Sequence, residues 1–382
     1  MNNSWFSQLS SKQRIWLFGT IAAMSLIVTV GLLMDSLATK PKTIQNFNID
    51  MSIKKTAPLL GVTGKGFARE LDLSLDVPKR KPLKTLGIST ENLEHAIEHI
   101  LSHHGTMLKY YIYAALVLGG LVFLVRLGRP DLSELKQKSV WYPRSPYILF
   151  LFISVIVAGF LLGKSPNPME GAVKVFKSMV GLYPDPVAKT AAFLFFIMLA
   201  LVGSKLICGW ACPFGALQEL LYTIPILKKA KKRKIPFIFT NTVRSLLFLS
   251  MLLFLFGIIG GRKGFVIYHN LNPFNLFDLD FESTAIIMTI LVALTASFFT
   301  YRPFCQLVCP FGFVSWLTER FAIFRVRIDK DKCIECGACI KACPTETTKG
   351  LINEKKLSAD CFSCARCLNV CPVDAIKYKF KK

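Results

Sequence analysis

The sequence Cys333-Ile-Glu-Cys336-Gly-Ala-Cys339-Ile-Lys-Ala-Cys343-Pro344 decides how the C-terminal part of this chain folds. Three closely spaced thiolates and a remote fourth suit an iron–sulfur cubane, because each of its four irons needs one outer ligand. A second run repeats the spacing with Cys361, Cys364, Cys367, Cys371 and Pro372. The two runs together predict an α+β two-cluster bacterial ferredoxin domain over residues 325–382.

The ligands of the two predicted [4Fe–4S] clusters follow from the way such runs are shared. In two-cluster ferredoxins the fourth cysteine of each run binds the other cluster. Zinc is the alternative, but structural zinc favours two separated Cys-x2-Cys pairs rather than a run of four. We therefore predict that cluster one takes Cys333, Cys336, Cys339 and Cys371, and that cluster two takes Cys361, Cys364, Cys367 and Cys343.

The other four of the twelve cysteines form two shorter motifs, Cys208-Gly-Trp-Ala-Cys212-Pro213 and Cys305-Gln-Leu-Val-Cys309-Pro310. Because residues four apart share a helix face, each pair is expected to point one way at the cytoplasmic end of its span. If the two copies pack about a local twofold, their thiols can form a third site for iron–sulfur, copper or zinc. The alternative is that these cysteines are small residues that close helix contacts.

The composition places the chain in a membrane. Hydrophobic residues make up 52% of the 382 residues, which is too many for an ordinary soluble protein. The net charge is +23, but most basic residues lie between apolar stretches, so membrane topology explains them better than nucleic acid. Six stretches have about the length of a spanning helix: Ile15–Met34, Tyr110–Leu127, Tyr147–Gly163, Ala188–Ile207, Val243–Gly260 and Ala285–Phe299.

The orientation follows from the basic loops. The loop between spans four and five contains Lys228-Lys229-Ala230-Lys231-Lys232-Arg233-Lys234, and such loops stay in the cytoplasm. Both termini are then cytoplasmic in a bacterial inner-membrane protein, which suits reduced cluster thiolates. The predicted domains are an anchor helix (1–34), a small helical extracytoplasmic insert (35–109), a membrane domain with two Cys-x3-Cys-Pro helical hairpins (110–324) and the ferredoxin domain (325–382).

These motifs and the paired spans between them resemble the membrane-bound polyferredoxin family, typified by NapH-type quinol dehydrogenase subunits and including NosR and CcoG. The resemblance covers roughly residues 147–382 and rests on Cys208–Gly215, Cys305–Gly312 and both ferredoxin runs. It implies electron transfer between quinone and a partner redox subunit or soluble carrier. It does not cover residues 35–109, where the flavin-attachment motif of NosR-type members has no counterpart.

The histidines are the remaining candidates. His269 lies at the outer end of span five among aromatic residues, where an imidazole can take a proton from quinol; ordinary interface composition is the alternative. His95, His99 and His103 have helical spacing, and they are either metal ligands or a polar helix face. Besides quinone-linked electron transfer, a copper-reducing or cofactor-assembly protein that uses the membrane thiols stays open.

Overall fold

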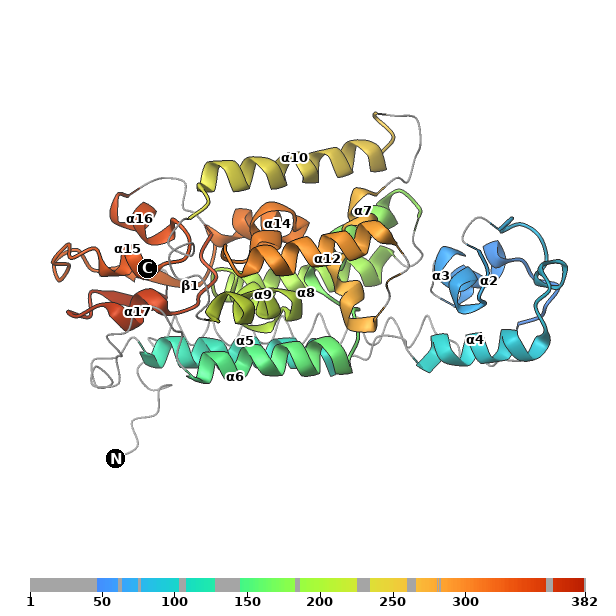
Figure 1. Cartoon of the computed structure of the whole chain (residues 1–382), viewed down its shortest axis with the longest axis horizontal. Helices are drawn as coiled ribbons and strands as arrows, with labels where there is room; N and C mark the ends of the chain where they lie inside the picture. The colour runs from blue at the N-terminus through green and yellow to red at the C-terminus, as the bar shows by residue number, and fades with distance from the viewer. Residues whose placement is uncertain are drawn as a thin grey trace.

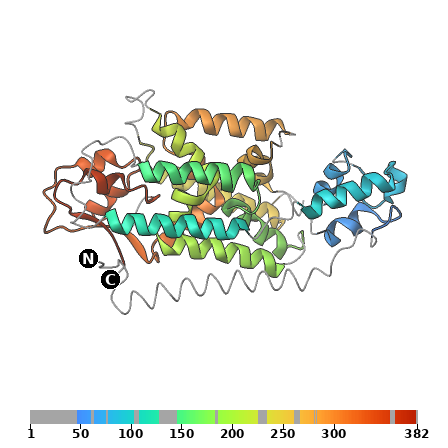
Figure 2. The same ribbon diagram turned by 90° about the horizontal axis from the view of Figure 1, so that it is seen from below.

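The computed structural model describes residues 47–60, 64–74, 77–102, 108–127, 145–182, 186–224, 234–259, 266–279, 281, 283–354 and 360–380. Three parts follow one another along the long axis (Figures 1 and 2). A small helical domain lies at one end, a helical bundle lies in the middle, and the cysteine-rich domain lies at the other end. The small domain and the cysteine-rich domain therefore do not share a side of the bundle.

The small domain is a helical unit with its own core. It consists of α2 (Ile53–Leu59), α3 (Gly64–Glu70), the 3-10 turn η3 (Leu83–Leu86) and α4 (Thr90–Ser102). Apolar side chains from these elements form a cluster separate from that of the bundle. The described residues of this unit are therefore mainly helical, as the sequence analysis expects for the insert.

The bundle contains the apolar helices that the sequence predicts. Two of them, α5 (Leu108–Leu127) and α10 (Phe237–Leu255), are long and apolar enough to cross a membrane. Three apolar helices are shorter: α6 (Ser145–Ile153) with its π-helical continuation η5 (Ser154–Leu161), α8 (Pro186–Val202) and α12 (Thr284–Ser297). The predicted span Ile15–Met34 lies outside the described residues, so six spans stay a prediction.

The outward faces of these helices are apolar. Large hydrophobic side chains that are at least half exposed include Leu149, Ile156, Ile238, Leu246 and Leu291. Soluble proteins rarely expose so much apolar surface, whereas a lipid-facing helix does so by default. The remaining bundle elements are short and lie between or beside these helices: α7 (Pro168–Met179), α11 (Ile267–Asn270) and the 3-10 helix η8 (Pro273–Asp278).

The two Cys-x3-Cys-Pro motifs form a pair of re-entrant hairpins, which we call hairpin A (residues 203–223) and hairpin B (residues 300–319). In hairpin A, the π-helix η6 (Ile207–Ala211) leads into α9 (Pro213–Thr223). In hairpin B, α13 (Pro303–Leu307) leads into α14 (Pro310–Glu319). Each turns back at its second cysteine, which is extended, and a proline begins the returning helix because it suits the first helical position.

This geometry corrects two expectations about the motifs. Cys208 lies in a π-helix and Cys212 caps the next helix, so the two do not share one α-helical face. Nor do both second cysteines lie at the ferredoxin end of the bundle. Cys212 is within electrostatic range of Lys109, in the first turn of α5, and a methyl group on Gly159 would contact both Pro213 and Phe277 of η8. Each hairpin therefore carries its second cysteine into the bundle.

The cysteine-rich domain has the α+β form predicted for it. Strands β1 (Phe324–Ile328) and β2 (Ile376–Phe380) pair antiparallel, with Phe324 opposite Phe380. Short helices α15 (Ala338–Ala342), α16 (Thr347–Ile352) and α17 (Arg366–Val370) follow the cysteine runs. The first and last segments of the domain pair with each other, so the two cysteine runs lie together between them.

Candidate functional site: two groups of thiols and a buried charge network

The four membrane cysteines lie together. Cys208, Cys212 and Cys305 are each only 8% exposed, and Cys309 is half-buried. Cys309 lies within electrostatic range of the other three. Among the described residues, no three cysteine, histidine or carboxylate side chains converge as a ready-made site for a single metal ion. The two hairpins therefore bring the four thiols near one another without forming a ready-made site for a single metal ion.

Contacts between the hairpins run in both directions. Lys205 Nζ of hairpin A donates a hydrogen bond to the carbonyl of Gly312 at 3.0 Å. Arg302 of hairpin B donates to the carbonyl of Cys208, and at 3.0 Å to that of Gly209. Both cations have a left-handed backbone, with φ of 58° and 43°. The basic residue three positions before each first cysteine thus binds the backbone of the opposite hairpin.

The hairpins also support each other's thiols. Gln218 Nε2 of hairpin A donates to Cys305 Sγ at 3.3 Å, and Ser315 of hairpin B hydrogen-bonds with Cys208. Within each hairpin a glycine packs against the first cysteine. A methyl group on Gly215 would lie 2.9 Å from the Cys208 carbonyl oxygen, and one on Gly312 would lie 2.6 Å from that of Cys305. The glycine of each Cys-Pro-Phe-Gly sequence is therefore required sterically.

A buried charge network joins the hairpins to the cysteine-rich domain. Asp360 pairs with Lys205 and Arg244, each at 2.5 Å. Glu219 pairs with Arg302 at 2.9 Å and with Arg366 at 2.7 Å. All six side chains are at most 3% exposed.

The network has more positive than negative charge. Four cations face two carboxylates, and burial raises the pKa of the neighbouring Glu319 to about 8, so this carboxyl is mostly neutral at pH 7. Buried charge is costly unless it is compensated. Thiolates, and clusters held by thiolates, are negative, so the excess of buried cations suits metal–sulfur groups at this interface.

The cysteine-rich domain contacts hairpin A closely, backbone to backbone. A methyl group on Gly209 would overlap the carbonyl oxygen of Phe362. Trp210 Nε1 donates to the Ser363 carbonyl at 2.9 Å, and Ser363 Oγ donates to the Ser204 carbonyl at 3.0 Å. The loop that begins at Cys361 therefore lies directly on the π-helix η6, which contains Cys208.

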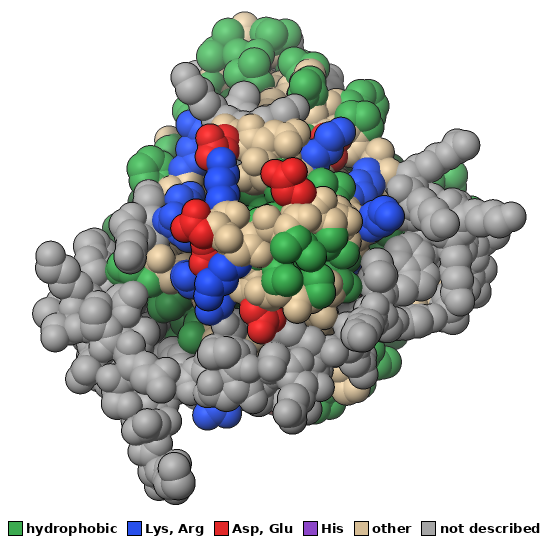
Figure 3. All heavy atoms as spheres, turned by 90° about the vertical axis from the view of Figure 1, so that its left-hand side faces the viewer, with side chains coloured by type: hydrophobic (Ala, Val, Ile, Leu, Met, Phe, Trp, Pro, Cys, Tyr) green, Lys and Arg blue, Asp and Glu red, His purple; other side chains and the backbone are tan. Residues whose placement is uncertain are grey.

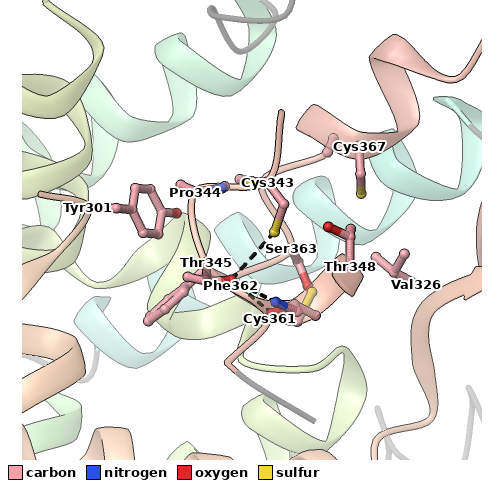
Figure 4. A pocket seen from close by; sticks show the side chains of 13 residues that line it. Tyr301, Val326, Cys343, Pro344, Thr345, Thr348, Cys361, Phe362, Ser363 and Cys367 are labelled. Carbon is pink, nitrogen blue, oxygen red and sulfur yellow. Dashed lines mark hydrogen bonds between the residues drawn. The ribbon is translucent and has the colours of Figure 1, made fainter. Parts of the chain in front are cut away.

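The eight ferredoxin cysteines lie in two groups. Cys339 is within electrostatic range of Cys371, Cys333 and Cys336. A cavity beside the second run is lined by Cys343, Cys361, Cys364 and Cys367, together with Thr345, Thr348 and Tyr301 (Figure 4). The first group coincides with the set predicted for cluster one, and the cavity contains the set predicted for cluster two. A cavity lined by four thiols suits a cubane.

The two groups differ in their position relative to the bundle. The cavity of the second group faces the hairpins, whereas Cys336 of the first group is exposed and Ile334 beside it is 61% exposed. The outer face of this end of the molecule shows apolar side chains among mixed acidic and basic ones (Figure 3). One group of thiols is thus buried at the interface, and the other reaches the surface.

The predicted histidines lie apart from the thiols. His269 is exposed on α11, whereas its neighbour Tyr268 is buried within electrostatic range of Cys309. His95 is exposed on α4, nothing is described of the His99 side chain, and His103 lies outside the described residues. Sequence reasoning missed Tyr268, Tyr301, Glu219 and Arg244. Arg244, a charge within an apolar stretch, was the clearest available signal.

Comparison with known families identifies the cysteine motifs. A model described as "4Fe-4S dicluster domain" matches residues 326–378, and a second of that description matches residues 303–347. A "4Fe-4S binding domain" model matches residues 189–234, which include Cys208 and Cys212. The C-terminal domain therefore binds two [4Fe–4S] clusters. This chain is a polyferredoxin-type 4Fe–4S protein.

Curated relatives agree with that family. The ferredoxin-type protein NapH of Escherichia coli is 25% identical over 184 residues, which are 46% of this chain and 61% of NapH. The regulatory protein NosR of Stutzerimonas stutzeri is 29% identical over 157 residues, 39% of this chain and 21% of NosR. An uncharacterized protein of Methanocaldococcus jannaschii is 26% identical over 198 residues, 52% of this chain and 71% of its own length. No solved structure matches.

Proposed function

We propose that this chain is a membrane-bound iron–sulfur protein that carries electrons between the quinone pool and a partner redox enzyme. The observation that carries the proposal is the contact between Gly209 and the Phe362 carbonyl. It joins the π-helix η6, which contains Cys208, to the loop of Cys361 and Cys364 with no side chain between the two backbones. The similarity to NapH, a ferredoxin-type protein, and to NosR, over 46% and 39% of this chain, also supports the proposal.

The ligand sets follow from the two groups of thiols. We propose that Cys333, Cys336, Cys339 and Cys371 hold cluster one, and that Cys361, Cys364, Cys367 and Cys343 hold cluster two. When bound, each cluster takes up and releases one electron at a time. The burial of the second group and the exposure of Cys336 support an order in which cluster two exchanges electrons with the membrane side and cluster one with the partner.

The membrane cysteines supply the third part of the proposed path. Cys208, Cys212, Cys305 and Cys309 would hold a further metal or iron–sulfur group between the quinone and cluster two. Lys205 and Arg302 stabilise thiolates there, because both are buried and lie within electrostatic range of Cys305. Oxidation of one quinol to quinone releases two electrons and two protons, and His269 at the outer surface remains our candidate to take up a proton.

The pooled membrane thiols also support a second function. A soft site of four sulfurs suits copper. Cluster two would be its reductant, since Gly209 beside Cys208 contacts Phe362 beside Cys361. In that case the chain is a metal reductase or a cofactor-assembly factor rather than a quinone-linked carrier. The two functions share the ferredoxin domain and differ in what the four membrane thiols hold.

One experiment separates these functions. The full chain is purified anaerobically in detergent, and its iron and copper are measured in the wild type, Cys208→Ala and Cys364→Ala. A quinol analogue is then added to the oxidised protein, and the clusters are followed by EPR. Iron beyond two cubanes that is lost in Cys208→Ala, with cluster reduction by quinol, supports the first function. Copper lost in Cys208→Ala supports the second, and clusters that quinol leaves oxidised contradict the first.

A further inference from the structure

Tyr301 belongs to hairpin B, yet it faces a site in the other domain. Its side chain lines the cavity that Cys343, Cys361 and Cys364 also line (Figure 4). The residue is 3% exposed, and its hydroxyl has no hydrogen-bond partner among the described residues. A buried hydroxyl without a partner costs free energy, so such a group requires an explanation.

The contacts of the Tyr301 ring fix its position. It packs edge-on against Phe362, with ring centroids 5.6 Å apart, and against Tyr222 at 5.3 Å. The guanidinium of Arg366 lies 5.5 Å from its centroid. Tyr301 is also within electrostatic range of Cys364. The ring is therefore held at the cavity wall, and its hydroxyl group is available to whatever the four thiols hold.

We propose that Tyr301 donates a hydrogen bond to a sulfur of cluster two and thereby raises the reduction potential of that cluster. The proposal rests on the ligand set proposed above for cluster two. Reduction adds one negative charge to a cluster, and a hydrogen-bond donor stabilises the more negative state. Tyr301 is thus a tuning residue that touches the cluster but does not bind its iron.

Tyr301 belongs to the membrane domain, whereas the cluster that it contacts belongs to the ferredoxin domain, so the two domains are coupled through this residue. Tyr301 immediately precedes Arg302, whose side chain binds the carbonyls of Cys208 and Gly209. The membrane domain therefore supplies both the contacts to hairpin A and the donor to cluster two. The potential of cluster two then depends on correct docking of the ferredoxin domain, whereas that of cluster one does not.

The test is an EPR redox titration of the full chain in detergent, comparing the wild type with Tyr301→Phe. This variant keeps the ring contacts and removes only the hydroxyl. We expect one of the two midpoint potentials to fall, with up to a tenfold change in the reduction equilibrium constant, which is 59 mV for a one-electron couple. The other midpoint should not move. Tyr113→Phe is the control, because it also removes a buried tyrosine hydroxyl of the bundle, and Tyr113 does not line this cavity.

The outcomes separate this proposal from the ligand assignment. Unchanged midpoints in a Tyr301→Phe protein with full iron content overturn it. If Tyr301→Phe loses iron, Tyr301→His, which retains a donor, decides: restored iron supports the donor role, and continued loss contradicts it. The ligand set proposed for cluster two is tested separately with Cys364→Ser. If this variant keeps the EPR signals of both clusters as in the wild type, the ligand set is wrong, whatever Tyr301 does.

Discussion

At the scale of single residues, the contact between Gly209 and Phe362 determines how close the two halves of the molecule lie. Most domain interfaces are formed by side chains, which adapt when one of them changes. Here a carbonyl oxygen occupies the space of a missing Cβ, so adaptation requires movement of the backbone. Gly209 is therefore needed for the ferredoxin domain to dock against the bundle. In the sequence this role is not apparent, because the motif Cys208-Gly-Trp-Ala-Cys212 is read for its cysteines.

We expect Gly209→Ala to displace the Phe362 loop and weaken docking of the ferredoxin domain. Forcing a methyl group into a packed contact costs roughly 1–3 kcal/mol. The readouts are the thermal unfolding midpoint and the rate at which the ferredoxin domain is cleaved from the bundle by protease. Gly350→Ala is the matched control, since a methyl group there meets nothing within 4 Å. Equal stability and equal protection in both variants would show that the contact has no energetic role.

At the scale of elements, the two hairpins repeat one design and complete each other. The paired contacts of Lys205 and Arg302, and those of Gln218 and Ser315, cross from one hairpin to the other. The outer connection between η5 and α8 contains the helix α7, which has Asn167 as its N-terminal cap. We expect the stability of α7 to depend on the carboxylate of Glu170 and not on the cysteines. The stability of α7 can therefore be tested separately from the metal–sulfur sites.

The outer connection should lose stability in acid through Glu170. Burial opposes ionisation of Glu170, but Lys174, the Ser165 hydroxyl and Lys164 outweigh it and lower the pKa, while Lys109 of α5 also faces it. Because the folded pKa lies below the ordinary value of about 4.3, this contribution is present above that pH and is lost as pH falls through the folded pKa. Hydrogen exchange of α7 between pH 3 and 7 is the measurement.

Replacement of the carboxylate should reproduce the acid effect at neutral pH. We expect Glu170→Gln to speed exchange in α7, through a loss of about 1.5–3 kcal/mol of local opening free energy, and to flatten its pH dependence. Glu98→Gln changes an exposed carboxylate on α4 and serves as the control. A pH profile of α7 that stays the same in Glu170→Gln would exclude this residue as the cause.

Sequence reasoning reached the cysteines and the helices but not what connects them. The spacing of the cysteine runs and the apolar stretches is local information, so the ferredoxin domain, α5 and α10 follow from it. The re-entrant course of the motifs was not predicted, because a π-helix and a turn at Cys-Pro read as one α-helix. Glu219 and Asp360 were missed because each lies far along the chain from the cations that it pairs with.

At the scale of the whole molecule, the small helical domain and the ferredoxin domain lie at opposite ends of the bundle (Figure 1). We expect these two domains to lie on opposite sides of the bilayer. In intact spheroplasts, a thiol reagent that cannot cross the membrane should label a cysteine introduced at Lys81, but not one introduced at Lys377. Labelling of both positions, or of neither, would contradict a bundle that spans the membrane between them.

In the proposed path, electrons pass from the membrane side to cluster two, then to cluster one and then to the partner. Loss of cluster one should therefore leave electrons on cluster two. Cys336 is exposed, so Cys336→Ser should damage cluster one without disturbing the interface. Electron transfer to a soluble acceptor should fall at least tenfold, while reduction of cluster two from the membrane side continues. The measurement is EPR of the reduced variant together with stopped-flow oxidation by the acceptor. An undiminished rate would mean that electrons leave from cluster two directly.

The exchange of contacts between the hairpins has a consequence for biosynthesis. Translation produces the N-terminal elements first, and hairpin A emerges with Lys205 before Gly312 and Asp360 exist. Until hairpin B and then the ferredoxin domain arrive, the first hairpin holds a cation whose partners are not yet made. The contacts of Lys205 are therefore completed only after Gly312 and Asp360, which are translated later, have emerged. A nascent chain that stops before Gly312 and Asp360 leaves Lys205 without these two partners.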